Sequence, residues 1–193
     1  LSTVDQTADY YTVDGYWNGA VWMPHQWFAF KALLDLGRAE EAWRIADTAL
    51  TLWQNEVDTS YHCFEHFIVE SGRGAGWHQF SALSTPVLYW FGAYHRPGHL
   101  TAGMDTWIHS MAFNEAHTAL ETELALYGAA HRTCCVIAAM EPGHTYRATF
   151  GGMPVEARIR TGGAVEVLLP NALGRGVLRV AAEDRALDQN PNT

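Results

Sequence analysis

The spacing of apolar residues changes near residue 98, and this change limits the chain to a mixed fold. Before it, apolar side chains recur three or four residues apart, as on one face of a helix. The clearest stripe consists of Trp43, Ala46, Leu50, Trp53 and Val57. After it, short β-rich segments alternate with glycine-containing turns. The sequence therefore predicts a fold that is mainly α with β, in which helical hairpins precede a small antiparallel β-sandwich or added sheet layer.

Two helices are expected to form a hairpin between residues 24 and 57. Pro24 suits the first turn of a helix that runs to about Leu36, with Gly37 as its C-terminal cap. Apolar residues lie on most sides of this helix, so we expect it to be buried. Glu40 and Glu41 open the second helix, where carboxylates favour the positive end of the helix dipole. A connection this short predicts that the two helices pack antiparallel.

A third helix is expected after a loop that covers residues 58–80. Ser84 or Thr85 is the predicted N-cap, with Pro86 just inside, and the helix should end before Arg96. In the β part, the predicted strands are residues 120–126, 132–140, 146–150, 155–159, 164–169 and 175–181. In domain terms, the prediction is a helical part over residues 1–98, a β part over 99–185 and a frayed tail over 186–193.

The charge and cysteine content exclude several classes of protein. A net charge of −9, from 21 acidic residues against 12 Lys and Arg, makes nucleic acid an unexpected partner. The 3 cysteines show neither disulfide nor zinc spacing, which favours a reducing cytoplasm. No apolar run is long enough for a membrane span, and no signal peptide is evident. Because the chain starts at Leu1 rather than Met, we expect it to be a processed or truncated piece of something longer.

An aromatic and amide-rich stretch over residues 16–26 is the first candidate binding site. Rings cover the apolar face of a sugar, and amides address its hydroxyl groups, so the stretch favours a saccharide site. The predicted contacts are Tyr16, Trp17, Asn18, Gly19, Trp22 and Gln26. The alternative is an aromatic loop that plugs a helical core. Trp77 and His78 form a second set of the same kind.

Glu65 is the carboxylate most suited to acid–base chemistry. It stands between Phe64 and Phe67, with His62 and His66 nearby. Aromatic surroundings predict a pKa raised by desolvation, which the imidazoles would tune. The alternative is an exposed glutamate paired with an imidazole.

Other candidate chemistry is weaker. Glu70 lies beside a Ser-Gly-Arg run and Asp14 before Gly15, so an ion pair and a turn are the simplest interpretations. His62 and His66 have the spacing of a helical metal pair, but no third ligand stands at a diagnostic distance, and we predict no metal. No serine elbow, dinucleotide motif or P-loop is present.

Several of these residues together resemble a known family. Residues 16–22, Tyr-Trp-Asn-Gly-Ala-Val-Trp, resemble the Tyr-Trp-Arg-Gly-x-Val/Ile-Trp signature of the glycoside hydrolase family 63 group, which includes mannosylglycerate and glucosylglycerate hydrolases. Glu65-His66-Phe67, followed by Ser71-Gly72 and Phe80-Ser81, is similar to that family's Glu-Asn-Tyr, Thr-Gly and Phe-Ser/Gly-Trp series. The chain departs from the pattern at Asn18, where the family has Arg, and at His66, where it has Asn.

The resemblance implies an (α/α)6 toroid and inverting hydrolysis of an α-glycosidic bond. In that family an Asp is the general acid, and the Glu of the Glu-Asn-Tyr motif is the general base. The position of that Glu corresponds to Glu65 in this sequence. Twelve helices do not fit into residues 1–98, so the resemblance implies the C-terminal part of such an enzyme. The remaining hairpins and the acid are then expected on a missing or separate polypeptide, the predicted partner of this chain.

The sequence thus predicts a glycoside hydrolase segment that acts on an α-glucoside or α-mannoside. Glu65 activates water, the residues of the 16–26 stretch with Trp77 and His78 line the sugar site, and no cofactor, nucleic acid or membrane is involved. Two alternatives stay open: a carbohydrate-binding or structural module without catalysis, and a sugar epimerase or phosphorylase on a similar toroid. A phosphorylase would need a phosphate site, for which Arg73 and His78 are the nearby candidates.

Overall fold

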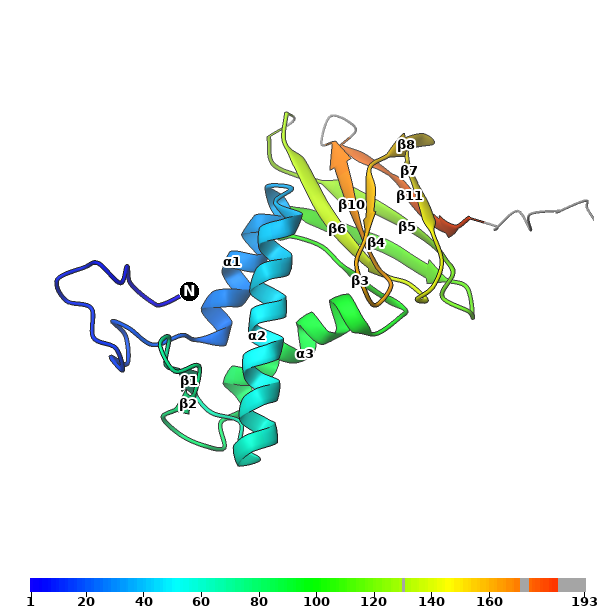
Figure 1. Ribbon diagram of the computed structural model, residues 1–193. Helices are drawn as coiled ribbons and strands as arrows, with labels where there is room; N and C mark the ends of the chain where they lie inside the picture. The colour runs from blue at the N-terminus through cyan, green and yellow to red at the C-terminus, as the bar shows by residue number, and fades with distance from the viewer. Residues whose placement is uncertain (130, 171–173, 184–193) are drawn as a thin grey trace, which may run out of the picture.

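A computed structural model describes residues 1–129, 131–170 and 174–183. These residues form three helices, α1 (Met23–Asp35), α2 (Ala39–Ser60) and α3 (Ser81–His95), followed by most of the strands (Figure 1). The prediction of a mixed fold, helical first and β-rich later, is confirmed. The predicted tail over residues 186–193 lies outside the described residues, and the division into domains stays a prediction.

The first two helices lie where the sequence places them. Pro24 occupies the first turn of α1, and Gly37 follows its end with φ of +66°, a conformation that glycine adopts without strain. α2 carries Glu40 and Glu41 in its first turn and runs antiparallel beside α1 (Figure 1). The expected burial of α1 on most sides is wrong for one face, because Phe28 is 57% exposed.

The start of α3 corrects the prediction. The helix begins at Ser81 rather than after Ser84 or Thr85, which places Pro86 inside it. Proline has no N–H to donate to the carbonyl of Ala82, four residues earlier. The hydroxyl of Thr85 donates to that oxygen instead, over 2.8 Å. The side chain interpreted as a cap therefore satisfies a carbonyl that the proline leaves free.

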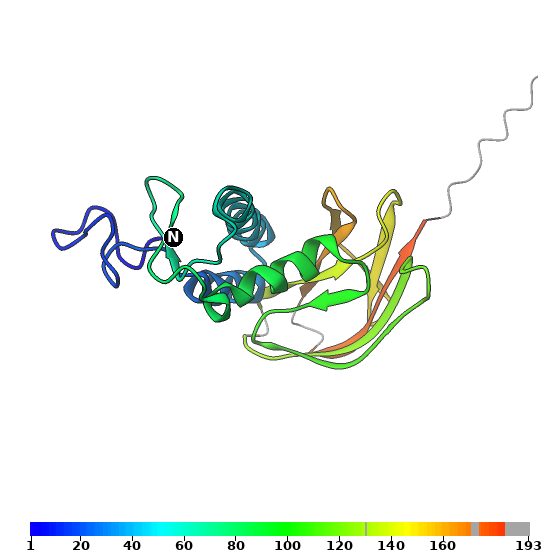
Figure 2. The same ribbon diagram turned by 90° about the horizontal axis from the view of Figure 1, so that it is seen from below.

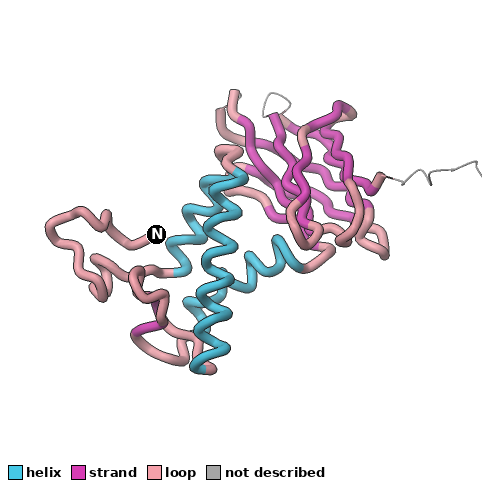
Figure 3. The backbone as a smooth tube through the Cα atoms, viewed as in Figure 1, coloured by secondary structure: helices cyan, strands magenta, loops and turns pink. Residues whose placement is uncertain are grey.

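Residues 58–80 were predicted to be a loop, but α2 continues to Ser60. The rest of the range contains a short pair of strands, β1 (His66–Phe67) and β2 (Gly74–Ala75). This hairpin and the N-terminal segment up to Val21 lie together at the end of the helices that is remote from the sheets (Figure 3). The same arrangement is visible in the perpendicular view, where loops, helices and sheets follow one another along the molecule (Figure 2).

The remaining strands form two antiparallel sheets. The four-stranded sheet has the order β3 (His99–Thr101), β6 (Thr133–Ala139), β10 (Ala164–Pro170), β9 (Ala157–Ile159). The five-stranded sheet has the order β4 (Thr106–Phe113), β5 (Ala119–Leu126), β11 (Arg175–Ala182), β7 (Tyr146–Phe150), β8 (Met153–Val155). The single strand predicted over residues 155–159 is two strands in different sheets, separated at Glu156. β3 and β4 were not predicted, because their sequences lack clear apolar alternation.

The strand β6 is buried on both faces, which explains its unbroken apolar sequence. Cys135 and Ile137 belong to the core shared with the helices, whereas Val136 and Ala138 belong to the core between the two sheets. The four-stranded sheet is therefore the middle layer, covered by α1 and α3 on one side and by the five-stranded sheet on the other. No disulfide joins the three cysteines, and among the described residues no helix is long and apolar enough to cross a membrane.

Polar contacts hold the helices on the middle layer. Arg160 donates to Glu166 of β10 over 2.9 Å and to Glu40 of α2 over 2.8 Å. At the end of α1, the buried carboxylate of Asp35 accepts the backbone N–H groups of Met104 and Asp105, over 2.8 and 2.9 Å. These contacts fix the orientation of α1 and α2 on the sheets. They thereby also position the loops at the helix ends that are remote from the sheets.

Candidate functional site

A backbone pairing between distant segments creates the candidate site. The N–H of Val21 donates to the carbonyl of Phe67 over 2.8 Å, and the N–H of Phe67 returns the bond over 2.9 Å. The first residue follows the aromatic stretch, and the second follows Glu65. The pairing therefore brings together the two motifs that carry the family resemblance, which are separated by more than 40 positions in sequence.

Both oxygens of the Glu65 carboxylate accept a hydrogen bond. The phenol of Tyr16 donates to Oε1, and the backbone N–H of Trp77 donates to Oε2 over 3.2 Å. The backbone N–H of Glu65 in turn donates to the carbonyl of Trp77 over 3.0 Å. The carboxylate is thus held in one orientation by the aromatic segment on one side and by the loop after β2 on the other.

The hydrogen bonds reverse the expected direction of the Glu65 pKa. Donation from Tyr16 is the largest cause and lowers the pKa of Glu65, with the Trp77 N–H and the charge of His66 acting in the same direction. For the reciprocal reason the pKa of Tyr16 is raised. The prediction of a pKa raised by aromatic surroundings is wrong, because the carboxylate is reached by solvent and stabilised by donors. A carboxylate of this kind is ionised at neutral pH, as a general base must be.

An aromatic stack supports these groups. Trp17 lies parallel to Trp22 at 4.6 Å, and Trp22 stacks on the imidazole of His66 at 5.1 Å. Tyr16 meets the edge of Trp22 at 4.7 Å. The stack has one open face, because Trp17 is 59% exposed whereas Trp22 is buried. The aromatic stretch is therefore partly core and partly surface, and its role as a sugar site stays a prediction.

The loop that carries Glu65 and Trp77 is fixed by a second glutamate. The carboxylate of Glu56, buried at the end of α2, accepts two bonds from Arg73, of 2.8 and 3.1 Å, and one from the N–H of Gly74. The Arg73 bonds are the largest cause that lowers the pKa of Glu56, to about 2. Arg73 is thus engaged by Glu56 through two of its nitrogens, although its side chain is 57% exposed.

Gly76 allows Glu65 and His66 to pack against the same backbone. Its φ is +76°, and a Cβ at this position would lie 2.6 Å from Oε2 of Glu65 and 2.9 Å from Nδ1 of His66. Any larger residue would displace the carboxylate.

The other predicted contacts lie at different distances from Glu65. Trp77 and His78 are exposed, and their rings stack at 6.1 Å; the hydrogen bonds of Trp77 with Glu65 are made by its backbone. Asn18 uses its amide within the loop, donating to the carbonyl of Tyr10 over 2.6 Å. Gly19 is buried against the carbonyl of Thr12, so a side chain has no room there. The roles of these residues in sugar binding stay predictions.

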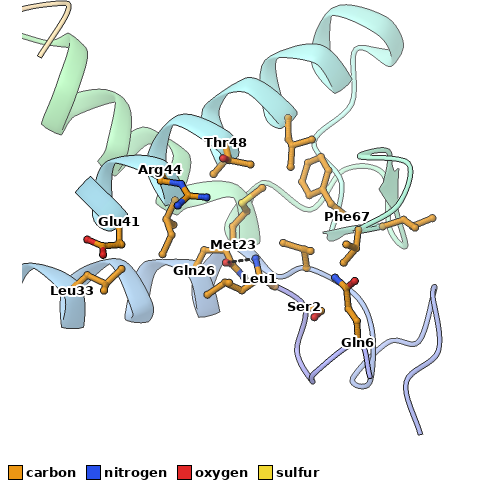
Figure 4. A pocket seen from close by; sticks show the side chains of 16 residues that line it. Leu1, Ser2, Gln6, Met23, Gln26, Leu33, Glu41, Arg44, Thr48 and Phe67 are labelled. Atoms are coloured by element: carbon orange, nitrogen blue, oxygen red, sulfur yellow. Dashed lines mark hydrogen bonds between the residues drawn. The ribbon is translucent and has the colours of Figure 1, made fainter. Parts of the chain in front are cut away.

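Gln26 faces a different space. Its amide bonds both the amino group and the carbonyl of Leu1, over 2.9 and 2.7 Å. It lines a largely apolar cavity of about 550 Å³ between α1, α2 and the residues that follow Phe67 (Figure 4). Neither Glu65 nor the rings of the aromatic stack line that cavity. Val21 and Phe67, which pair next to the site, do line it.

Two features of the site were not recognised in the sequence. Tyr16 was assigned to sugar contact, whereas its hydroxyl bonds Glu65. Asp14, interpreted as a turn residue, places Oδ1 at 3.6 Å from Nε2 of the buried His66. The signal for the second feature was present, because a histidine inside an aromatic cluster requires a polar partner. Within the described ranges, no group of three or more His, Cys, Asp and Glu side chains is arranged to hold a metal ion.

Comparison with known proteins agrees with the resemblance seen in the motifs. Residues 1–82 match the sequence model of the mannosylglycerate hydrolase MGH1-like glycoside hydrolase domain. This match ends at the start of α3 and contains Tyr16, Glu65 and the aromatic stack. The resemblance is therefore confirmed over this part of the chain, which is glycoside-hydrolase-like. No curated protein matches the sequence.

Proposed function

We propose that this chain contributes the general base and part of the sugar site to an inverting glycoside hydrolase that acts on an α-glucoside or α-mannoside. The observation that carries the proposal is the Glu65 carboxylate, ionised, oriented by Tyr16 and the Trp77 N–H, and bordered by exposed rings. It stands in the segment that matches the glycoside hydrolase model.

In the proposed reaction, Glu65 takes a proton from a water molecule while the water oxygen attacks the anomeric carbon. A carboxylic acid on the other side of the sugar protonates the leaving oxygen, and in inverting enzymes the two carboxyl groups stand about 6.5–9.5 Å apart. Tyr16 keeps Glu65 in the ionised form and fixes the oxygen that faces it. The Trp77 N–H fixes the other oxygen, so the base meets the water with little loss of orientation.

We further propose an arrangement for the helices and sheets within the complete enzyme. The helices α1 to α3 would be the last hairpins of an (α/α)6 toroid, and the two sheets would form an accessory sandwich against its outer side. The acid and the other hairpins would come from another part of the enzyme. Tyr16, Trp17 and Trp77 would cover the sugar ring, with His78 at its edge.

The test is Glu65→Gln in the complete enzyme, with Glu115→Gln as the control. Glutamine keeps the size and can still accept a bond from Tyr16, but it cannot take a proton. We expect turnover to fall by about 10²–10⁴ while sugar affinity is retained. Glu115 is an exposed glutamate in the turn between β4 and β5, and its variant should keep full activity. Turnover of the Glu65→Gln variant near the wild-type rate would remove the assignment of the base.

A carbohydrate-binding module without catalysis is the second candidate, supported by the exposed faces of Trp17 and Trp77. It predicts sugar binding that survives Glu65→Gln and no turnover in any assembly that contains the chain. Calorimetric titration together with an assay for released reducing sugar separates the two. A phosphorylase has less support, because the guanidinium of Arg73 is bound to Glu56.

A further inference from the structure

His66 is a buried imidazole directly beside the proposed base. Its side chain is 4% exposed, stacked on Trp22 and met edge-on by Tyr16 at 5.5 Å. The family pattern has Asn at this position, so the imidazole is a feature of this chain. A buried polar ring packed against two aromatic rings requires defined partners for its two nitrogens.

The two nitrogens have different surroundings. Nε2 faces the carboxylate of Asp14 at 3.6 Å, so that in a neutral ring the proton is expected on Nε2 rather than on Nδ1. Nδ1 is buried and has no hydrogen-bond partner within the described part of the chain. In the neutral ring Nδ1 is therefore an acceptor that nothing satisfies, and an unpaired buried acceptor costs stability.

The unsatisfied nitrogen lies on the side of Glu65. Nδ1 of His66 and Oε2 of Glu65 both lie within 3 Å of the position that a Cβ on Gly76 would occupy. A proton added to Nδ1 would therefore lie on the same side of the ring as the Glu65 carboxylate, within electrostatic range but without a hydrogen bond to it, while Nε2 faces Asp14. In its charged form the ring would lie between two carboxylates.

We propose that His66 is a positioning residue for Glu65: oriented by Asp14 and packed against Trp22 and Tyr16, it places its imidazole, which is a cation when protonated, next to the base. The proposal rests on the proposed function in one respect, namely that Glu65 is the base. Among the described residues, the titratable groups that face the ring are Asp14 and Tyr16 from the segment before Val21 and Glu65, the residue that precedes β1. The loop after β2 contributes Gly76 and Trp77, which do not titrate.

The charge of His66 acts in a defined direction. A cation beside Glu65 favours its ionised form, so the charged imidazole keeps the base available as pH falls. When the imidazole is removed, Glu65 loses this support and protonates at higher pH. The acid limb of kcat/KM should therefore lie at lower pH in the wild type than in a variant without the imidazole.

The first experiment follows the His66 ring by NMR titration in the intact chain and needs no turnover. Asp14→Asn is the test variant, because Asp14 is 61% exposed and its replacement leaves the ring packing in place. We expect the midpoint of the His66 titration to move to lower pH in Asp14→Asn, since a carboxylate that stabilises the charged ring is lost. The midpoint of the exposed His109 serves as the internal reference. An unchanged His66 midpoint would overturn the proposal.

The second experiment measures the pH dependence of kcat/KM in the complete enzyme for His66→Asn, the residue of the family pattern, and for His109→Asn as the control. We expect the acid limb of His66→Asn to move to higher pH while the control keeps the wild-type profile. A merely structural role would lower the rate by the same factor at every pH, and that result would contradict the proposal. If no assembly turns over a glycoside, the proposed function fails, whereas the NMR titration still decides the placement of the charge.

Discussion

Two regions of this protein contain a glutamate, a tyrosine and a tryptophan in close association, yet their chemistry is opposite. At the far end of the helices, Glu65 is bonded by Tyr16 next to the half-exposed Trp17. At the helix–sheet interface, Glu166 is 2% exposed and lies with Tyr94 and Trp43 around the guanidinium of Arg160. The residue types alone do not distinguish the two.

Access to solvent and hydrogen bonding distinguish them. The pKa of Glu65 is lowered, chiefly by the Tyr16 hydroxyl, whereas the pKa of Glu166 is raised, chiefly by burial. Tyr94 is fully buried, its hydroxyl has no hydrogen-bond partner among the described residues, and burial raises its pKa. The charged groups at the interface are therefore shielded from solvent, whereas the Glu65 carboxylate is accessible to it.

The largest expected effect is loss of stability when the interface charge is left unpaired. In Arg160→Met the carboxylate of Glu166 remains buried without its partner, and removing one partner of a buried pair costs about 3–5 kcal/mol. Arg158→Met is the control, because Arg158 is half exposed and its contacts with carboxylates are longer. Urea denaturation at pH 7 measures both variants. Equal stability of the two variants would show that the interface pair is not a structural requirement.

The same variant gives a pH test with a defined sign. Burial raises the pKa of Glu166 in the folded state, and loss of Arg160 should raise it further. The folded state then binds a proton more tightly than the unfolded state, so stability is present at low pH and is lost as pH rises through the folded pKa. Arg160→Met should therefore recover part of its stability deficit relative to wild type when the pH is lowered.

A smaller loss is expected for Glu56→Gln, which weakens the support of the loop that carries Glu65. Glutamine cannot accept the bidentate bonds of Arg73, and we expect a loss of about 1–3 kcal/mol in the free energy of unfolding. Because the folded pKa of Glu56 is lowered to about 2, its contribution is present above the unfolded value of 4.5 and is lost as pH falls towards 2. The stabilities of wild type and variant should converge over that range, and a constant difference would contradict the assignment.

A moderate effect, on rate rather than stability, is expected for Tyr16→Phe in the complete enzyme. The ring contacts with Trp22 remain, but the largest cause of the lowered Glu65 pKa is removed. We expect a loss of about tenfold in kcat/KM at neutral pH, and an acid limb that moves to higher pH. An unchanged pH profile would mean that the Tyr16 hydroxyl does not act on the base.

The sequence predicted the elements better than the contacts between them. The stripes and turn residues of α1 and α2, the apolar run of β6 and the short β-rich segment of β7 are local patterns, and the structure contains these elements close to the expected bounds. The start of α3 could not be found in the same way. The rule that places proline in the first turn assumes an unsatisfied N–H, and it does not foresee that Thr85 bonds the free carbonyl.

The sequence identified several residues of the candidate site, but it did not predict which of them contact one another. The motifs identified Tyr16 and Glu65 separately, whereas their hydrogen bond depends on the pairing of Val21 with Phe67, a contact between distant segments. The direction of the Glu65 pKa was wrong for the same reason. Neighbours in sequence suggested an apolar setting, and donors from elsewhere in the chain determine the result.

The smallest effect is expected for Tyr94→Phe, which is the interface counterpart of Tyr16→Phe. The Tyr94 hydroxyl is buried without a hydrogen bond from the described residues, so its removal relieves a desolvation cost while leaving only a small void. These terms oppose each other, and we expect the free energy of unfolding to change by less than about 1 kcal/mol. Activity of the complete enzyme should not change, in contrast to Tyr16→Phe. A loss of stability well above about 1 kcal/mol, measured by thermal and urea denaturation, would indicate that a water molecule bridges the Tyr94 hydroxyl and Oε2 of Glu166. The interface would then contain a hydrogen-bonded tyrosine and glutamate, as the region around Glu65 does.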